Sequence, residues 1–327
     1  MDFMKTKLTL YILPHRRRNC LIIYLILLIL FVTLVVHKIY LTTRTWTEDD
    51  WFKLRPTGGI INYQHDYLIQ SEPACDDSTQ LVVFIFSRPE AFSVRSVLRK
   101  TWLSMGPEDH SVVYRFILGS VKDEKTSAQV KKESQQFGDI ILDQTFSDSY
   151  QLLVLKTISM VNWVTNYCPN VDAMLKTDDD SWINVPKLLE IIPTLKSGIH
   201  GHVYRFSGSS TDPNDPWYMP PETYPFGHYP DFTSGSGYLL VNHGTRLFNK
   251  LLKTLSTIRT IWTEDIFLTG LVAEKAGIHR YHHEGFNPTK VPTDQICHYK
   301  HLISSHKLNE YDLSQIYTSL TDPNLNC

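Results

Sequence analysis

An acidic triple at the end of an apolar stretch constrains the fold of this chain more than any other feature. Largely apolar residues 171–175 lead into Lys176-Thr177-Asp178-Asp179-Asp180. This order predicts a buried strand that runs out into a short acidic loop. On extended backbone, Asp178 and Asp180 point to one side and Asp179 to the other. Two hard oxygen ligands on one face suit Mg²⁺ or Mn²⁺, which would relieve the repulsion between the carboxylates. A solvated acidic turn is the alternative.

Apolar runs and amphipathic segments alternate along the chain before and after the triple. The order strand, helix, strand, helix predicts an α/β domain with a mostly parallel central sheet flanked by helices. Ligands of such sheets bind at the carboxyl ends of the strands, which is where the triple lies. The expected strands are Leu81–Phe86, Val112–Leu118 and Ile140–Leu142, and the expected helices are Phe92–Trp102, Thr126–Phe137, Leu152–Val164 and Pro186–Ile192.

A long loop rich in Gly, Pro, Ser, Tyr and His, residues 198–237, separates the two halves of the domain. Ordered loops of this length usually have a function. Its aromatic residues could stack on sugar rings or could pack the loop down, and the sequence favours neither. At its end, Gly235 and Gly237 would let a ligand approach the backbone closely. The aromatic residues are Trp217, Tyr218, Tyr224, Phe226 and Tyr229.

Two further helices are expected after this loop, His243–Leu255 and Ile266–Ala276. Thr263 is a good N-cap for the second, and Glu264 and Asp265 lie in its first turn, where the helix dipole favours negative charge. From this stretch alone, both acids are explained by capping electrostatics.

The amino terminus contains the run Cys20–Val36, which has no charged residue in seventeen positions. Three arginines, residues 16–18, precede it and only Lys38 follows closely, so the amino terminus is expected in the cytosol. We predict a cytosolic tail at 1–19, a single transmembrane signal anchor at 20–36, a stem at 37–77 and a lumenal domain at 78–327. A cleaved signal peptide is the alternative, but no small-residue cleavage site follows the run.

Charge and cysteine content narrow the class further. Residues 1–38 have a net charge of +5, so the rest of the chain has −7, given the total of −2. A mildly acidic body does not suggest a nucleic-acid partner. Beyond Cys20 there are four cysteines, which allow two disulfides in three connectivities. They are Cys75, Cys168, Cys297 and Cys327.

Six blocks in order resemble the β-1,3-galactosyltransferase and β-1,3-N-acetylglucosaminyltransferase family. The signature R-x-x-x-R-x-T-W is matched from Arg95 to Trp102, and K-x-D-D-D-x-F-V-N from Lys176 to Asn184. The other blocks are Asp148–Trp163, Tyr224–Tyr238, Glu264–Gly270 and the tail from Cys297 through His306 to Cys327. Together they span residues 81–327.

The resemblance implies a GT-A nucleotide-sugar fold, type II topology in the Golgi membrane and inverting transfer from a UDP-sugar to a glycan acceptor on a glycoprotein or glycolipid. It implies a Mn²⁺ (or Mg²⁺) ion on Asp180, with His306 as the metal-side histidine in preference to His282 and His283. Asp265 is the implied base, with Glu264 as second choice. The implied donor-binding residues are Arg95 and Arg99 on the uridine diphosphate, Asp178 on the ribose, Asp179, Lys176, Gly235 and Gly237.

The chain departs from the family pattern at Leu152-Leu153-Val154, where Asn-Leu-Thr is usual, and at Ser181 and Trp182. Galactose is the expected sugar, with N-acetylglucosamine or N-acetylgalactosamine as alternatives. The lost Asn-Leu-Thr also motivates a non-catalytic, sugar-binding relative as a second hypothesis. A phosphatase of the haloacid type is a third, but its acidic pair would follow the first strand of the domain.

Overall fold

The computed structural model describes residues 22, 24–35, 65–69 and 75–327. The chain divides into two units, Met1–Trp51 and Phe52–Cys327. In the first unit, residues 22 and 24–35 are helical. No helix among the described residues is long and apolar enough to cross a membrane. The predicted cytosolic tail, both ends of the predicted signal anchor and most of the predicted stem lie outside the described residues.

The second unit is built on an eight-stranded sheet in the order β1-β4-β3-β2-β5-β8-β7-β9. The pairs β1–β4, β5–β8 and β7–β8 are antiparallel, and the others are parallel. The sheet is therefore mixed, and the prediction of a mostly parallel sheet is wrong for its second half. The strands are β1 Tyr67–Ile69, β2 Leu81–Phe86, β3 Val112–Ser120, β4 Ile140–Ser147, β5 Ala173–Asp178, β7 Gly198–Tyr204, β8 Phe232–Val241 and β9 Arg280–His282.

β7 and β8 are antiparallel neighbours joined by a long loop rather than by a crossover helix. A loop allows the second strand to run antiparallel to the first, whereas parallel neighbours need a crossover connection. The run Ser234–Tyr238, expected as a glycine-containing loop, lies entirely inside β8. Two short strands, β6 (Trp182–Ile183) and β10 (Ser304–Ser305), pair separately from the main sheet.

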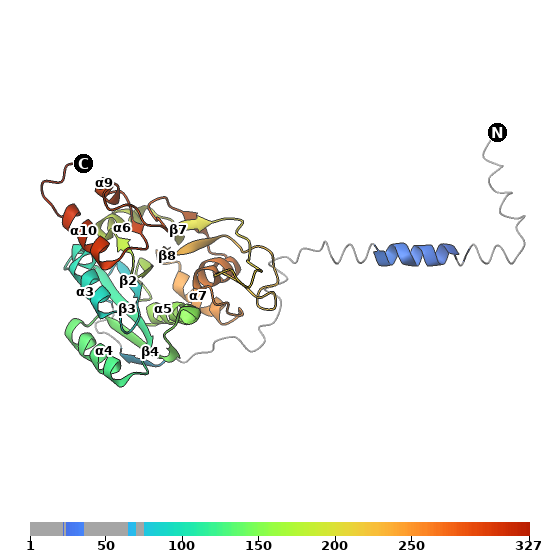
Figure 1. Cartoon of the computed structure of the whole chain (residues 1–327), viewed down its shortest axis with the longest axis horizontal. Coiled ribbons are helices and arrows are strands. Elements are labelled where there is room, and N and C mark those ends of the chain that lie inside the picture. Colours follow the sequence, from blue (N-terminus) through green and yellow to red (C-terminus); the bar gives the residue numbers. More distant parts are fainter. Residues whose placement is uncertain (1–21, 23, 36–64, 70–74) are drawn as a thin grey trace, which may run out of the picture. The chain divides into compact units, whose positions relative to one another are not determined.

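Helices cover both faces of the sheet (Figure 1). On one face, Leu98, Val130 and Leu313 from three helices share a core with alternate residues of β2. On the other face, the ring of Phe84 packs edge-on against Trp163 at 5.6 Å. In Figure 1, α10 (red) lies beside α3 (cyan), although the two are far apart in the sequence. The first face carries α3 Phe92–Lys100, α4 Glu124–Phe137, α6 Val185–Ile191 and α10 Glu310–Leu320, and the second carries α5 Leu153–Tyr167 and α7 Leu247–Leu255.

Short helical segments complete the domain, and two of them differ from the expected helices. The helix predicted at 266–276 is a π-helix, η5 (Ile266–Val272), continued by α8 (Ala273–Lys275). The helix predicted from His243 begins at Leu247, because His243, Gly244 and Arg246 have positive φ. The remaining segments are η2 Trp102–Met105, η3 Tyr150–Leu152, η4 Ile192–Thr194 and α9 Ile296–Tyr299.

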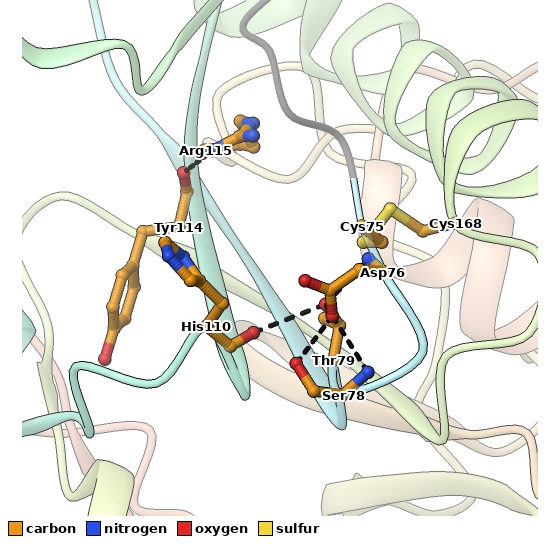
Figure 2. Close-up of a disulfide and its surroundings, with 8 residues drawn as sticks. All are labelled: Cys75, Asp76, Ser78, Thr79, His110, Tyr114, Arg115 and Cys168. Carbon is orange, nitrogen blue, oxygen red and sulfur yellow. Dashed lines mark hydrogen bonds between the residues drawn. A yellow bond between two sulfur atoms is a disulfide. The ribbon is translucent and has the colours of Figure 1, made fainter.

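Two disulfides are present, Cys75–Cys168 and Cys297–Cys327, which selects one of the three possible connectivities. Figure 2 shows the first, where Cys75 precedes Asp76, whose carboxylate accepts hydrogen bonds from Ser78. This bridge links the start of β2 to the end of α5, and β1 pairs with β4. The folded domain therefore includes residues that the sequence assigned to the stem, and a boundary at residue 78 would remove a strand and a disulfide.

Candidate active site

The acidic triple lies where it was predicted, at the carboxyl end of a buried strand. Asp178 is the last residue of β5 and is paired with Phe86, the last residue of β2. The N–H of Asp179 donates to the Phe86 carbonyl at 3.1 Å, so the chain turns directly after the strand. Parallel pairing of β2 and β5 thus brings the loops that follow both strands to one edge of the sheet.

Asp178, Asp180 and His306 form a cluster that we call the chelating cluster. Their ligand atoms all lie within 4.8 Å of one another, and all three side chains are partly buried. His306 Nε2 is 3.0 Å from Asp180 Oδ1 and 3.8 Å from Asp178 Oδ2. His306 directly follows β10, whose pairing with β6 fixes it beside the triple. The Leu308 N–H also donates to the Asp180 carbonyl at 2.9 Å.

The predicted alternation of the triple is confirmed, because Asp179 turns away from the chelating cluster and bonds to the side chain of Ser87. Burial raises the pKa of Asp179, and the Ser87 hydrogen bond opposes this. The two carboxylates of this donor set fit Mn²⁺ or Mg²⁺, which prefer hard oxygen ligands, and the imidazole adds one nitrogen ligand. His282, by contrast, accepts the Val203 N–H at 3.1 Å and belongs to another edge of the sheet.

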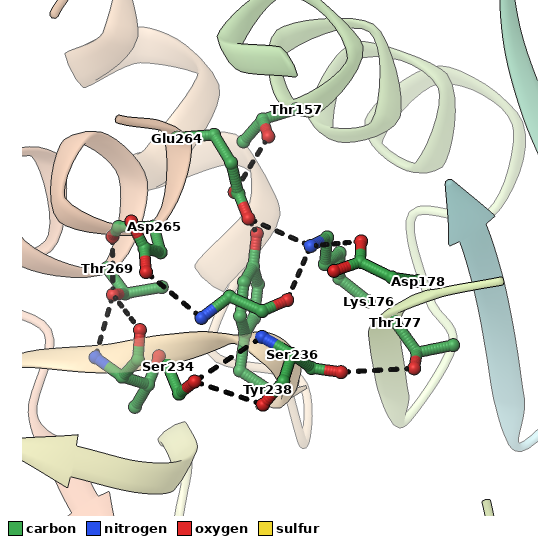
Figure 3. A network of polar contacts seen from close by, with 12 residues as sticks. Thr157, Lys176, Thr177, Asp178, Ser234, Ser236, Tyr238, Glu264, Asp265 and Thr269 are labelled. Carbon is green, nitrogen blue, oxygen red and sulfur yellow. Dashed lines mark hydrogen bonds and ion pairs between the residues drawn. The ribbon is translucent and has the colours of Figure 1, made fainter. Parts of the chain in front are cut away.

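Lys176 joins the chelating cluster to a second acidic group (Figure 3). Its Nζ lies 2.8 Å from Asp178 Oδ1 and 2.9 Å from Glu264 Oε1, and it also donates to the Gly235 carbonyl. Burial lowers the pKa of Lys176, but the two carboxylates outweigh it and the net shift is upward. The side chain is only 1% exposed, so Lys176 organises the site and does not meet a donor, contrary to the prediction.

Glu264 belongs to this second group, which we call the base cluster and define as Thr157, Tyr238, Glu264 and Asp265. Of its two acids, Glu264 is the buried one. Its Oε2 accepts hydrogen bonds from Thr157 Oγ1 at 2.9 Å and Tyr238 OH at 3.2 Å. Burial raises the pKa of Glu264 to about 7, against the lowering effect of Lys176. Both carboxylate oxygens are occupied, so Glu264 is placed to hold its neighbours.

Asp265 is the partly exposed member of the base cluster. Its Oδ1 accepts from its neighbour, the Ile266 N–H, at 2.8 Å, and its Oδ2 accepts from the Gly235 N–H at 3.1 Å. Burial raises the pKa of Asp265, while the Ile266 N–H and the Lys176 charge lower it. The predicted N-cap, Thr263, is wrong: its hydroxyl has no hydrogen-bond partner among the described residues, and Asp265 caps η5 instead.

The absence of a side chain at Gly235 leaves space for the base cluster. A Cβ at this position would lie 2.8 Å from Glu264 Oε1 and 3.3 Å from Asp265 Cβ. A Cβ at Gly237 would make ordinary contacts, the nearest being Ser304 Oγ at 3.6 Å. The tight neighbours of Gly235 are thus the two acids, and donor binding by both glycines stays a prediction.

Arg95 and Arg99 are also corrected, because both are used inside the protein. Arg95 is 0% exposed and makes a bidentate pair with Glu133 at 2.9 and 2.6 Å. It also donates to the carbonyls of Arg88 and Pro89. Arg99 pairs with Glu133 and, through two nitrogens, with Asp139. Neither guanidinium is available to a diphosphate, and Arg95 instead fixes the loop that follows β2.

That loop presents Arg88, which the sequence analysis missed. Arg88 is exposed, and its guanidinium makes no hydrogen bond or ion pair with the described residues. It lines a pocket of about 670 Å³ together with Asp179 and Asp180 on one side and Glu310 and Tyr311 on the other. Small-molecule sites are usually roughly 300–1,000 Å³. The sequence could have indicated Arg88 by its position, because it follows a fully buried strand at the sheet edge where the triple lies.

Comparisons with known proteins show which family the chain belongs to. A family model described as galactosyltransferase matches residues 93–284. The chain belongs to the galactosyltransferase family and is a glycosyltransferase. It is 30% identical over 275 residues to beta-1,3-galactosyltransferase 1 of Mus musculus and of Homo sapiens, covering 81% of this chain and 81% of each relative. It is 30% identical over 280 residues to lactosylceramide 1,3-N-acetyl-beta-D-glucosaminyltransferase of Rattus norvegicus, covering 80% and 72%.

Among solved structures, the chain is similar to the galactosyltransferase LgtC at 11% identity and a TM-score of 0.38, covering 74% of this chain and 96% of LgtC. It is similar to mouse xyloside xylosyltransferase 1 at 11% identity and a TM-score of 0.35, covering 70% and 97%. At these scores the backbones differ widely, so neither likeness bears on function.

Proposed function

We propose that this chain is a metal-dependent, inverting β-1,3-glycosyltransferase of the GT-A type. It moves a hexose, galactose, from a UDP-sugar to the 3-hydroxyl of a glycan acceptor. The observation that supports this most is the connection of two acidic clusters through Lys176, one with a chelating donor set and one with a partly exposed carboxylate. The proposed location is the Golgi membrane, with type II topology, on the basis of the apolar run at 20–36 and its basic flank.

The chelating cluster is the proposed donor side. Asp180 and His306, with Asp178, would hold Mn²⁺ or Mg²⁺, which when bound neutralises charge on a leaving diphosphate. Arg88 replaces Arg95 and Arg99 as the proposed cation for the phosphates, because it is exposed in the pocket next to Asp180. A guanidinium suits this role since it can make bidentate contacts with phosphate oxygens.

The base cluster is the proposed acceptor side. Asp265 takes the proton from the acceptor hydroxyl as its oxygen attacks the anomeric carbon. The new carbon–oxygen bond forms on the face opposite the leaving group, and the bond to UDP breaks with its electron pair on the phosphate oxygen, so configuration inverts. Lys176 and Glu264 keep Asp265 in place through Gly235, and partial burial keeps the Asp265 pKa from falling to the value of an exposed capping acid.

N-acetylglucosamine is the alternative donor sugar, because the relatives named above for galactosyl and for N-acetylglucosaminyl transfer are equally similar to this chain, each at 30% identity. None of the residues described in the site distinguishes the two sugars.

The test is Asp265→Asn in the full-length chain, compared with wild type in donor binding and in transfer. Calorimetry with UDP-galactose, UDP-N-acetylglucosamine and UDP-N-acetylgalactosamine, each with and without Mn²⁺, should show metal-dependent binding of one donor above the others. The variant should keep this binding and lose roughly 10²–10⁴-fold in transfer rate. Asp294→Asn is the matched control, since Asp294 is an exposed aspartate outside both clusters.

Full activity in Asp265→Asn would overturn the assignment of the base. Donor binding without turnover by the wild type, over a broad panel of acceptors, would favour the non-catalytic sugar-binding relative. No donor-dependent heat in folded protein would overturn the function itself.

A further inference from the structure

Three aromatic side chains from separate segments meet on the surface of the domain. Tyr150 comes from η3, Trp217 from the loop between β7 and β8, and Trp262 from the segment before η5. The rings of Trp217 and Trp262 are stacked, with centroids 6.0 Å apart and an interplanar angle of 3°. Tyr150 lies 6.4 Å from Trp217 and 6.1 Å from Trp262. We call these three residues the aromatic platform.

Two rings of the aromatic platform, those of Trp217 and Tyr150, are largely exposed to solvent, unlike the buried rings of Tyr224 and Tyr229 in the loop. Trp217 is 57% exposed and Tyr150 is 55% exposed, whereas Tyr224 is 2% and Tyr229 is 6% exposed. Tyr224 and Tyr229 pack against each other at 4.8 Å and hold the loop to the domain. The buried rings therefore pack the loop down, whereas Trp217 stacks on Trp262 and still leaves more than half of its surface exposed.

Hydrogen bonds connect the segments that carry the platform. Trp262 Nε1 donates to the Tyr218 carbonyl at 3.2 Å, which ties the segment before η5 to the loop. The backbone N–H of Trp217 donates to Asp215 Oδ1 at 2.7 Å. A contiguous patch of exposed apolar side chains commonly marks a ligand-binding or interaction site.

The platform also adjoins the base cluster. Trp262 precedes Glu264 by two residues and Asp265 by three. Burial raises the pKa of Tyr150, and the charges of Asp265, Asp178 and Glu264 raise it further. The Tyr150 hydroxyl makes no hydrogen bond with the described residues.

We propose that Tyr150, Trp217 and Trp262 form a binding site for the acceptor saccharide, whose apolar C–H face rests on the rings while its hydroxyl edge turns toward Asp265. A pyranose ring suits this surface because its axial C–H groups carry partial positive charge and meet the electron-rich ring faces. This inference rests on the proposed function for the identity of the ligand, but saccharide binding can be measured without turnover.

The first experiment measures binding of lactose and N-acetyllactosamine to the full-length chain by tryptophan fluorescence and calorimetry, with no donor present. Wild type should bind at least one disaccharide. Trp217→Ala should weaken that binding about tenfold, equal to the loss of one aromatic contact of roughly 1.4 kcal/mol. Trp217→Phe should restore most of it. Phe206→Ala is the matched control, because Phe206 is 87% exposed and lies outside the platform.

The second experiment measures kinetics with saturating donor. Trp217→Ala should raise the acceptor KM about tenfold and leave donor binding and acceptor-independent release of UDP unchanged. Unchanged saccharide binding in Trp217→Ala, an equal effect of Phe206→Ala, or no binding of either disaccharide by wild type would overturn the platform. Saccharide binding that depends on Trp217 in a protein that transfers no sugar would support the platform and overturn the proposed function, so the two failures are distinguishable.

Discussion

The chelating cluster and the base cluster are both acidic, but the protein satisfies them to different degrees. In the base cluster, Glu264 has a partner for each oxygen and is 6% exposed. In the chelating cluster, the Asp180 side chain is 45% exposed and forms an ion pair with His306. In the base cluster, protein groups satisfy the buried Glu264 carboxylate. The chelating cluster places two carboxylates and an imidazole where they could hold a cation. The difference is that the base cluster is satisfied by protein groups, whereas the chelating cluster leaves carboxylate surface exposed.

Lys176→Met tests the connection between the clusters and should have the largest effect on stability. It leaves Glu264 buried without its cation, which typically costs about 3–5 kcal/mol in the free energy of unfolding. Urea unfolding of the full-length chain measures this, with Lys187→Met as control, since Lys187 makes only a surface pair with Glu190. Adding Glu264→Gln should restore part of the loss. Equal effects of both lysine variants would show that the two clusters are independent.

His306→Ala tests the chelating cluster alone. Removing a ligand should weaken Mn²⁺ binding at least as much as loss of an outer-shell partner does, roughly 10–100-fold. Calorimetry with MnCl₂ and no nucleotide gives this value directly. His301→Ala is the control, because His301 is an exposed histidine outside the cluster. If both variants bind Mn²⁺ like wild type, His306 is not a ligand.

The pH dependence of stability tests the base cluster. Burial raises the pKa of Glu264 from 4.5 to about 7, so this group favours the folded state most below pH 4.5, and that contribution is lost as the pH rises through 7. The stability of wild type relative to Glu264→Gln should therefore fall by about 1–3 kcal/mol between pH 5 and pH 8. Unfolding of both proteins at the two pH values measures it, and a constant difference would contradict the raised pKa.

Gly235→Ala should lower the free energy of unfolding by about 1–3 kcal/mol, the usual cost of overpacking. The new methyl group would lie 2.8 Å from Glu264 Oε1 and would displace the base cluster. Gly227→Ala is the control, because a Cβ there meets nothing within 4 Å. Thermal unfolding and transfer rate should both fall for Gly235→Ala only. Normal stability together with weakened donor binding would instead support the predicted role of Gly235 in binding the donor.

Much of the site was predictable because it depends on patterns among residues that are close in the sequence. A buried strand ending in acids predicts where Asp178 lies, and period-two geometry predicts that Asp179 points away. The motif resemblance identified His306, which no local pattern could place beside Asp180. The same resemblance misassigned Arg95 and Arg99, because a motif shows which residues recur and not whether their charges face a ligand or a buried Glu133.

The sequence by itself determined the alternation of elements, the buried strand under the acidic triple and membership of a glycosyltransferase family. Only the tertiary structure decided the strand directions, the disulfide pairing and the partners of each charged side chain. The physical reason is that periodicity is a property of neighbouring residues, whereas an ion pair such as Lys176–Glu264 joins residues 88 positions apart through the packing of β5, β8 and η5. Whether a buried charge binds a ligand or supports the fold depends on those distant partners.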